Sequence, residues 1–133
     1  KINFADIKMK DNYKRIKAYA QSKLALILFT KYLSRTLGND GVVVNAVYPG
    51  RVKTPLTNVL HPLIRFILWL TMVKPEKGAE TSIFVAYSDK IKHISGEYFS
   101  NKKVCQTNAI ANDMKLAEKL WKLGRSYLKN WVD

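Results

Sequence analysis

Residues 42–50 read VVVNAVYPG, a short β-branched run that ends in Pro49-Gly50. Its nearly continuous apolar character predicts an interior strand of a parallel sheet over residues 42–48. The segment before it, residues 18–37, is rich in Ala, Leu and Lys, has no Gly or Pro, and repeats apolar residues at helical spacing. This helix is apolar on more than one side and should be well buried, with Gly38 a good candidate for its C′ position. A helix, a short turn and a buried strand make half of a βαβ unit, which predicts an α/β fold.

The rest of the chain predicts loops, helices and one more strand. Residues 1–17 are polar without a sustained period and are expected to form a loop. Residues 59–73 should form one or two short helices interrupted at Pro62. Three further elements are expected: a helix over residues 79–88 with Pro75 and Glu76 suited to its N-terminus, a strand over 97–100, and an amphipathic C-terminal helix over 108–131 docked on the body.

Length and composition bound the class of protein. A chain of 133 residues is one domain at most, and 47% hydrophobic residues argue against disorder. The single cysteine, Cys105, cannot form an internal disulfide, which favours a reducing intracellular compartment. His61 and His93 lie far apart with no metal-ligand spacing, so we expect no metal site. The apolar window of residues 59–73 falls short of the roughly 20 residues that span a bilayer, so a buried or membrane-surface helix fits it better.

The chain is strongly basic, with 23 Lys and Arg against 10 Asp and Glu, a formal net charge of +13. This charge favours anionic partners such as nucleic acid, acidic lipid or a phosphate-bearing cofactor. The basic residues are scattered, however, and only residues 8–17 are dense, so a solvated basic surface is the simpler interpretation. No nucleic-acid-binding signature is present, and aromatic residues are not interleaved with the basic cluster. We therefore expect no nucleic-acid partner, while the apolar window and the basic surface are compatible with peripheral contact with a membrane.

A tyrosine and a lysine four residues apart on a helix can form an acid/base pair. They lie on the same face, and a neighbouring ammonium favours the phenolate, which suits a tyrosine to proton transfer. The spacing occurs three times, at Tyr13/Lys17, Tyr19/Lys23 and Tyr98/Lys102, so spacing alone does not choose between catalysis and surface contact. Only Tyr19/Lys23 opens a strong predicted helix that leads into a buried strand.

The motifs around this pair resemble the second half of the short-chain dehydrogenase/reductase signature. The Tyr-x-x-Ser-Lys helix (residues 19–23), the Val-x-Val-Asn strand (42–45) and the Pro-Gly-x-Val-x-Thr loop (49–54) appear in the family's order and spacing. Further stretches are similar to the retinol-dehydrogenase-like branch, among them INF (2–4), SKLA (22–25), KPEKGAETS (74–82), SGEYF (95–99) and AEKLW (117–121). The match covers almost the whole chain.

The resemblance implies an NAD(P)-dependent alcohol dehydrogenase or carbonyl reductase. Tyr19 would exchange a proton with the substrate oxygen, and Lys23 would favour its phenolate and bind the nicotinamide ribose. The nicotinamide end of the cofactor would be lined by Pro49, Gly50, Val52 and Thr54. Residues 55–74 would form the substrate lid, whose apolar content suits a lipophilic, retinoid-like substrate; a plain core or membrane-surface helix is the alternative. The branch favours NADP over NAD.

The resemblance begins midway through the family's fold. The six glycines form no Gly-x-x-x-Gly-x-Gly turn for the pyrophosphate. We therefore expect residues 1–133 to be a partial domain, the C-terminal half of a doubly wound, Rossmann-like parallel sheet with flanking helices. The N-terminal dinucleotide-binding half would be absent, and the chain alone would neither bind a dinucleotide nor turn over. The competing interpretations are an inactive truncated fragment or paralogue and a basic module that binds nucleic acid or an acidic membrane. The branch implies a cytoplasmic or endoplasmic-reticulum-associated location.

Overall fold

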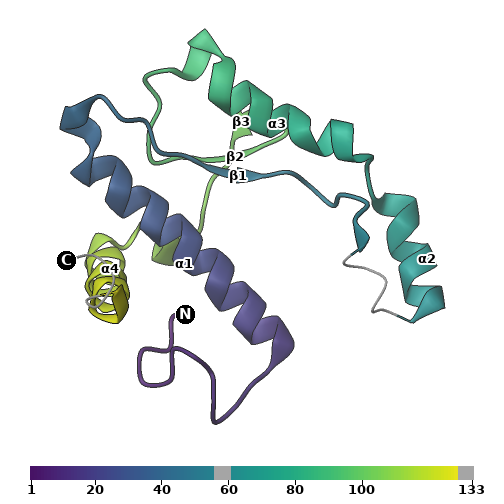
Figure 1. Ribbon diagram of the computed structural model, residues 1–133, viewed down its shortest axis with the longest axis horizontal. Coiled ribbons are helices and arrows are strands. Elements are labelled where there is room, and N and C mark those ends of the chain that lie inside the picture. Colours follow the sequence, from purple (N-terminus) through teal and green to yellow (C-terminus); the bar gives the residue numbers. More distant parts are fainter. Residues whose placement is uncertain (56–60, 129–133) are drawn as a thin grey trace. The chain divides into compact units, whose positions relative to one another are not determined.

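The computed structural model describes residues 1–55 and 61–128 (Figure 1). The chain divides into two compact units, which are described separately. Unit 1 comprises residues 1–46, 94–97 and 106–133, and unit 2 comprises residues 47–93 and 98–105. Val59 and Leu60 of the predicted lid helix, and residues 129–131 of the predicted C-terminal helix, lie outside the described residues.

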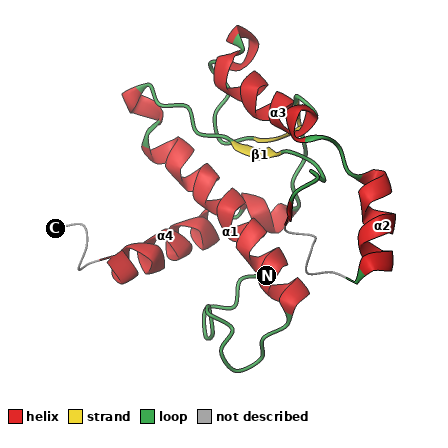
Figure 2. Ribbon diagram, turned by 45° about the vertical axis from the view of Figure 1, so that its right-hand side comes forward, coloured by secondary structure: helices red, strands yellow, loops and turns green. Residues whose placement is uncertain are grey.

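Unit 1 is built on two packed helices, α1 (Arg15–Thr36) and α4 (Met114–Leu128), as Figure 2 shows. Leu28 of α1 and Ala117 of α4 are buried together with Ile2 of the N-terminal segment. Phe29 and Tyr32 pack their rings against Trp121. The ring centre of Trp121 lies 5.1 Å from that of Phe29 and 5.2 Å from that of Tyr32. The C-terminal helix therefore docks on the body, as predicted, and Trp121 is a packing residue.

Short 3-10 turns and polar caps shape the ends of these helices. The turn η1 (Gly38–Asp40) follows α1 and ends at Gly41, whose φ of 72° lies in the left-handed region. The turn η4 (Ala109–Asn112) precedes α4, and the carboxylate of Asp113 accepts a hydrogen bond from the Leu116 amide at 3.0 Å. This cap explains why the predicted helix over residues 108–131 starts as a separate turn.

The side chain of Asn45 joins two chain segments in unit 1. Its amide nitrogen donates to the Ile94 carbonyl at 2.7 Å, and its oxygen accepts from the Glu97 amide at 2.9 Å. Backbone bonds from Gly96 N to Val44 O and from Ala46 N to Glu97 O lie on either side. The two segments advance in the same direction, as parallel segments do.

The sheet has three short strands in the order β1 (Ala46–Tyr48), β2 (Tyr98–Ser100) and β3 (Lys103–Val104). Strands β2 and β3 pair antiparallel around Asn101 and Lys102. Phe99 of β2 is almost fully buried. In unit 2, α3 (Pro75–Tyr87) lies against β2 and is followed by the turn η3 (Asp89–Ile91), while α2 (Pro62–Thr71) precedes α3.

Several sequence predictions are confirmed: the helices around residues 18–37, 59–73 and 79–88, and the strand over 97–100. Both Pro62 and Pro75 occupy the first turn of their helices. Pro62 therefore starts α2 and does not interrupt it, because the first-turn amide that proline lacks has no partner inside a helix.

Other predictions are wrong in their boundaries or burial. Helix α1 begins at Arg15, inside the predicted loop, and of its large apolar side chains only Leu28 is buried because α4 and the N-terminal segment cover one side. The strand predicted over residues 42–48 is confined to Ala46–Tyr48 and lies at the edge of the three-stranded sheet, half exposed. Gly38 follows α1 as predicted, but the left-handed conformation falls at Gly41.

Candidate active site

The predicted acid/base pair lies on the exposed side of α1, in unit 1. Tyr19 is 62% exposed, and the ammonium nitrogen of Lys23 lies 5.4 Å from the centre of the Tyr19 ring. The Ser22 hydroxyl donates to the Tyr19 carbonyl at 2.8 Å, so it is engaged with the helix backbone. The Tyr19 ring and the Lys23 ammonium thus lie next to each other on the exposed side of the helix.

Gln21 fixes the opposite side of the same helical turn. Its side-chain oxygen accepts from the Asn3 amide at 2.8 Å, and its side-chain nitrogen donates to the Ile7 carbonyl at 3.1 Å. Gln21 is buried, which is uncommon for this residue type unless its polar atoms are paired. Gln21 therefore ties the N-terminal segment to the turn that carries Tyr19 and Lys23, a positioning role that the motif pattern alone did not reveal.

The segment from Pro49 to Thr54 lies in unit 2 and is held by residues that follow α2. The Val73 amide donates to the Arg51 carbonyl at 2.8 Å, and the Lys53 amide donates to the Val73 carbonyl at 3.0 Å. Gly50 has a φ of 85°, a conformation that favours glycine over any residue with a Cβ. These bonds fix the course of the segment before and after Val52.

Val52 packs tightly against α3. A Cβ built on Gly78 would overlap the Val52 side chain, so only a glycine allows this helix to approach so closely. Gly78 is itself buried in the first turns of α3. Its role was missed in the sequence, where a glycine near a helix start looks like a capping or loop residue.

A pocket of about 840 Å³ adjoins this segment in unit 2. It is formed by the end of the segment, by one face of α2 and by the residue that follows α2: Lys53, Thr54, Pro55, Pro62, Arg65, Phe66, Trp69 and Met72. The ammonium of Lys53 lies 3.7 Å from the centre of the Trp69 ring. The predicted cofactor residue Thr54 and the predicted lid therefore share one cavity, whose lining combines apolar side chains with two cations.

The predicted site residues fall in the two separately described units. Tyr19 and Lys23 come together on α1 in unit 1, and Pro49, Gly50, Val52 and Thr54 form one continuous segment in unit 2. The structure thus brings together each part of the predicted site within its own unit.

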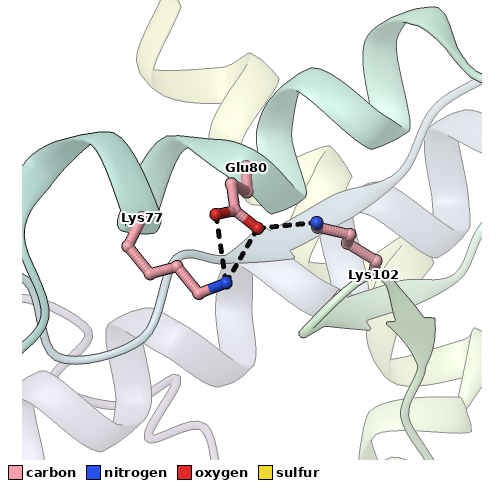
Figure 3. A network of polar contacts seen from close by, with 3 residues as sticks. All are labelled: Lys77, Glu80 and Lys102. Carbon is pink, nitrogen blue, oxygen red and sulfur yellow. Dashed lines mark hydrogen bonds and ion pairs between the residues drawn. The ribbon is translucent and has the colours of Figure 1, made fainter.

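The two other Tyr-x-x-x-Lys pairs have different surroundings. Tyr13 precedes α1, so it does not share a helical face with Lys17. Lys102 turns to α3, where its ammonium forms an ion pair with Glu80 at 2.6 Å. Figure 3 shows Glu80 between Lys77 and Lys102. The Lys102 ammonium, and after it Lys77, holds the pKa of Glu80 below its usual value.

The two histidines and the acidic side chains lie apart from one another. Among residues 1–55 and 61–128, His, Cys, Asp and Glu side chains form no group of three or more that could hold an ion. His61 caps α2, because its Nδ1 accepts a hydrogen bond from the Leu63 amide at 3.4 Å.

Comparison with known proteins places these features in context. Residues 2–101 match the family model described as enoyl-(acyl carrier protein) reductase. Homo sapiens retinol dehydrogenase 14 is 38% identical over 126 residues, which cover 90% of this chain and 38% of that protein. Homo sapiens polyprenol dehydrogenase is 35% identical over 126 residues, with the same coverage of 90% and 38%. The chain thus spans less than half the length of the curated relatives that it matches.

A solved structure shows the same fold. The crystal structure of an uncharacterized protein from Mycobacterium Paratuberculosis matches with a TM-score of 0.69 at 24% identity. The match covers 97% of this chain and 45% of that one. It supports the predicted fold class, part of a Rossmann-like α/β fold, and at this identity it carries information on the fold alone.

Proposed function

This chain belongs to the short-chain dehydrogenase/reductase family, in its retinol-dehydrogenase-like branch, and we propose that it carries the proton-transfer half of an NAD(P)-dependent oxidoreductase. The observation that carries the proposal is the exposed Tyr19 phenol with the Lys23 ammonium beside its ring. In reduction, the Tyr19 hydroxyl gives its proton to the carbonyl oxygen of the substrate. In oxidation, the Tyr19 phenolate takes the proton of the alcohol.

The family resemblance implies that residues of this chain would serve one end of a dinucleotide. A bound nicotinamide supplies or accepts the hydride in this chemistry. Lys23 offers three N–H donors that suit ribose hydroxyls, and Pro49, Gly50, Val52 and Thr54 would line the nicotinamide end. The pyrophosphate normally sits on a glycine-rich turn, and the six glycines of the sequence form no such turn. We therefore expect residues 1–133 to need a dinucleotide-binding half for cofactor binding. The resemblance to the retinol-dehydrogenase-like branch implies NADP in preference to NAD.

A lipophilic alcohol or carbonyl compound is the proposed substrate class. Phe66, Trp69 and Met72 line the pocket that Thr54 shares, which gives a long apolar molecule surface to bury. Two relatives are named for retinol and polyprenol, which are both long apolar alcohols. Pocket and names together favour a retinoid-like substrate over a small polar one.

A chimera tests the proposal. Residues 1–133 replace the matching segment of Homo sapiens retinol dehydrogenase 14, and reduction of retinal with NADPH is followed by the appearance of retinol. We expect turnover by the chimera, and no saturable NADPH fluorescence change with residues 1–133 alone. A chimera that folds and binds NADPH but yields no retinol or other alcohol product from lipophilic aldehydes would overturn the proposed function. Micromolar NADPH binding by residues 1–133 alone would overturn the need for a second half.

A further inference from the structure

The pocket of unit 2 has two cations in a wall whose other large side chains are apolar. Helix α2 contains one charged residue, Arg65, and no helix among residues 1–55 and 61–128 is long and apolar enough to cross a membrane. The single charge of α2 lies in the pocket wall, where Lys53 joins it from the segment before the helix. Each cation therefore faces the space that a bound molecule would occupy.

The two cations are close to one another. The Lys53 ammonium lies 3.7 Å from the centre of the Trp69 ring. Arg65 and Trp69 are four residues apart on α2, so they are neighbours on one face of the helix. The tryptophan ring therefore holds the Lys53 ammonium within one helical turn of the arginine.

No acidic side chain neutralises this pair. Residues 41–75 contain no Asp or Glu. The ion pairs between described residues involve Glu80, Asp89 and Glu118, and none of them includes Lys53 or Arg65. The tryptophan ring attracts the Lys53 ammonium but leaves its charge in place. The pocket thus carries two positive charges without a counter-charge from the described protein.

A neutral ligand and an anionic ligand would meet this wall differently. A neutral lipophilic molecule displaces water from the cations and gives them no partner, which is costly for a charged group. An acidic group offsets this cost, because hydrogen bonds between charged partners are about twice as strong as neutral ones. The Arg65 guanidinium has the fork of N–H donors that matches a carboxylate or a phosphate, and the Lys53 ammonium adds further donors.

The rest of the wall suits a long apolar chain. Phe66, Trp69 and Met72 line the pocket beside Pro55 and Pro62. The pocket volume of about 840 Å³ is in the upper part of the range of about 300–1,000 Å³ for small-molecule sites. A phosphate or carboxylate ion alone would leave most of this volume and the apolar side chains without contacts.

We propose that this pocket binds lipophilic molecules with an acidic group, a carboxylate or a phosphate, more tightly than neutral molecules of the same chain length. The acidic group binds Arg65 and Lys53, and the chain lies along Phe66, Trp69 and Met72. The inference rests on the proposed function, since it narrows the substrate class of the same pocket. Binding needs neither Tyr19 nor a cofactor, so the inference and the proposed reaction can fail separately.

The fluorescence of cis-parinaric acid, a polyene fatty acid, tests the inference with the 133-residue chain and no cofactor. Its methyl ester is the neutral control, because the ester has the same chain without the charge. We expect saturable binding of the acid at neutral pH that is at least about tenfold tighter than binding of the ester. High salt should weaken binding of the acid more than that of the ester.

A pair of arginine variants locates the effect. Arg65→Gln removes a pocket cation, and Arg51→Gln removes an exposed arginine of unit 2 that bonds to the Thr71 hydroxyl and does not line the pocket. We expect Arg65→Gln to lower the ratio of acid to ester affinity at least about fivefold, and Arg51→Gln by less than about twofold. Lys53→Met is a second pocket variant should circular dichroism show that Arg65→Gln unfolds.

Competition identifies the acidic group and the need for a chain. Displacement by hexadecanoic acid or by hexadecyl phosphate, but not by hexadecanol at the same concentration, would support the inference and show which group is preferred. The inference would be overturned by equal affinities for acid and ester, by equal effects of the two arginine variants, or by absence of binding. Inorganic pyrophosphate that displaces the probe as well as hexadecyl phosphate would also contradict it. The chimera with retinol dehydrogenase 14, titrated in the same way, serves as the host should the 133-residue chain show no cooperative unfolding.

Discussion

The ammonium nitrogen of Lys23 lies 5.4 Å from the centre of the Tyr19 ring, one helical turn along α1. At this distance the cation interacts with the ring, and both side chains are exposed. Gln21, between them in sequence, points to the protein interior and binds the N-terminal segment. The turn thus leaves Tyr19 and Lys23 exposed while Gln21 fixes it to the N-terminal segment.

Replacing Asn45 should loosen the connection between residues 42–46 and 94–97. Asn45→Asp keeps the acceptor for the Glu97 amide but places a carboxylate oxygen against the Ile94 carbonyl, where the native side chain donates. Loss of this partly buried hydrogen bond, which leaves the Ile94 carbonyl unsatisfied, should cost about 1–3 kcal/mol. Urea unfolding should show this loss for Asn45→Asp and a smaller one for the exposed control Asn112→Asp. Equal stability of Asn45→Asp and the unmodified chain would show that the Asn45 side-chain hydrogen bonds do not contribute to stability.

The Gly78→Ala variant should have a lower free energy of unfolding than the Gly124→Ala variant, although both glycines lie inside helices. A Cβ at Gly124 meets nothing within 4 Å, so Gly124→Ala should raise the free energy of unfolding by about 0.5–1 kcal/mol through helix propensity. A Cβ at Gly78 overlaps Val52, whose branched side chain is stiff, so overpacking of about 1–3 kcal/mol should outweigh that gain. Urea unfolding of the two variants checks the order. A Gly78→Ala protein as stable as Gly124→Ala would mean that α3 and Val52 do not pack as closely as described.

Glu80 should stabilise the chain at neutral pH and lose its effect in acid. Lys102 and Lys77 lower the folded-state pKa of Glu80, so its contribution is fully present above the unfolded pKa of about 4.3 and disappears as pH falls through the lowered folded value. Glu80→Gln should therefore lower the Tm at pH 7, and the difference from the unmodified chain should shrink with acidification. Glu118→Gln is the control, because Glu118 pairs only with Lys122 on its own helix among the described residues. A Tm difference for Glu80→Gln that stays constant from pH 7 to acid would contradict this account.

Helices were predictable where their periodicity and end signals agree. Pro75 and Glu76 mark the start of α3 in sequence and in structure. The start of α1 was not predicted because its N-cap residue is Lys14, which makes no side-chain cap bond. The Ser, Thr, Asp or Asn that usually marks a helix start is absent from this position. Residues 42–45 have strand-like composition, yet Val44 donates to the Ser95 hydroxyl in place of a regular ladder partner.

The hairpin of β2 and β3 could not be predicted from the sequence for a different reason. Its two-residue turn places Asn101 and Lys102 at φ values of 51° and 60°. Two-residue turns of this kind usually have the sequence Asn-Gly. Here a lysine takes the second position, so the sequence does not predict the turn. At the candidate site, the motif spacing identified Tyr19, Lys23 and residues 49–54, but Gln21 and Gly78 act through contacts to residues distant in sequence, which no local pattern encodes.

The central claim is that Tyr19, and neither of the other tyrosines with a lysine four residues later, transfers the proton. The direct measurement is retinal reduction by the chimera with retinol dehydrogenase 14, carrying Tyr19→Phe, Tyr13→Phe or Tyr98→Phe. Tyr13 is a matched control, because it is 68% exposed where Tyr19 is 62% exposed. We expect kcat to fall at least about a hundredfold with Tyr19→Phe, the scale of a lost general acid, with NADPH binding retained and little change with Tyr13→Phe. Retained turnover with Tyr19→Phe, or equal losses with all three substitutions, would contradict the assignment.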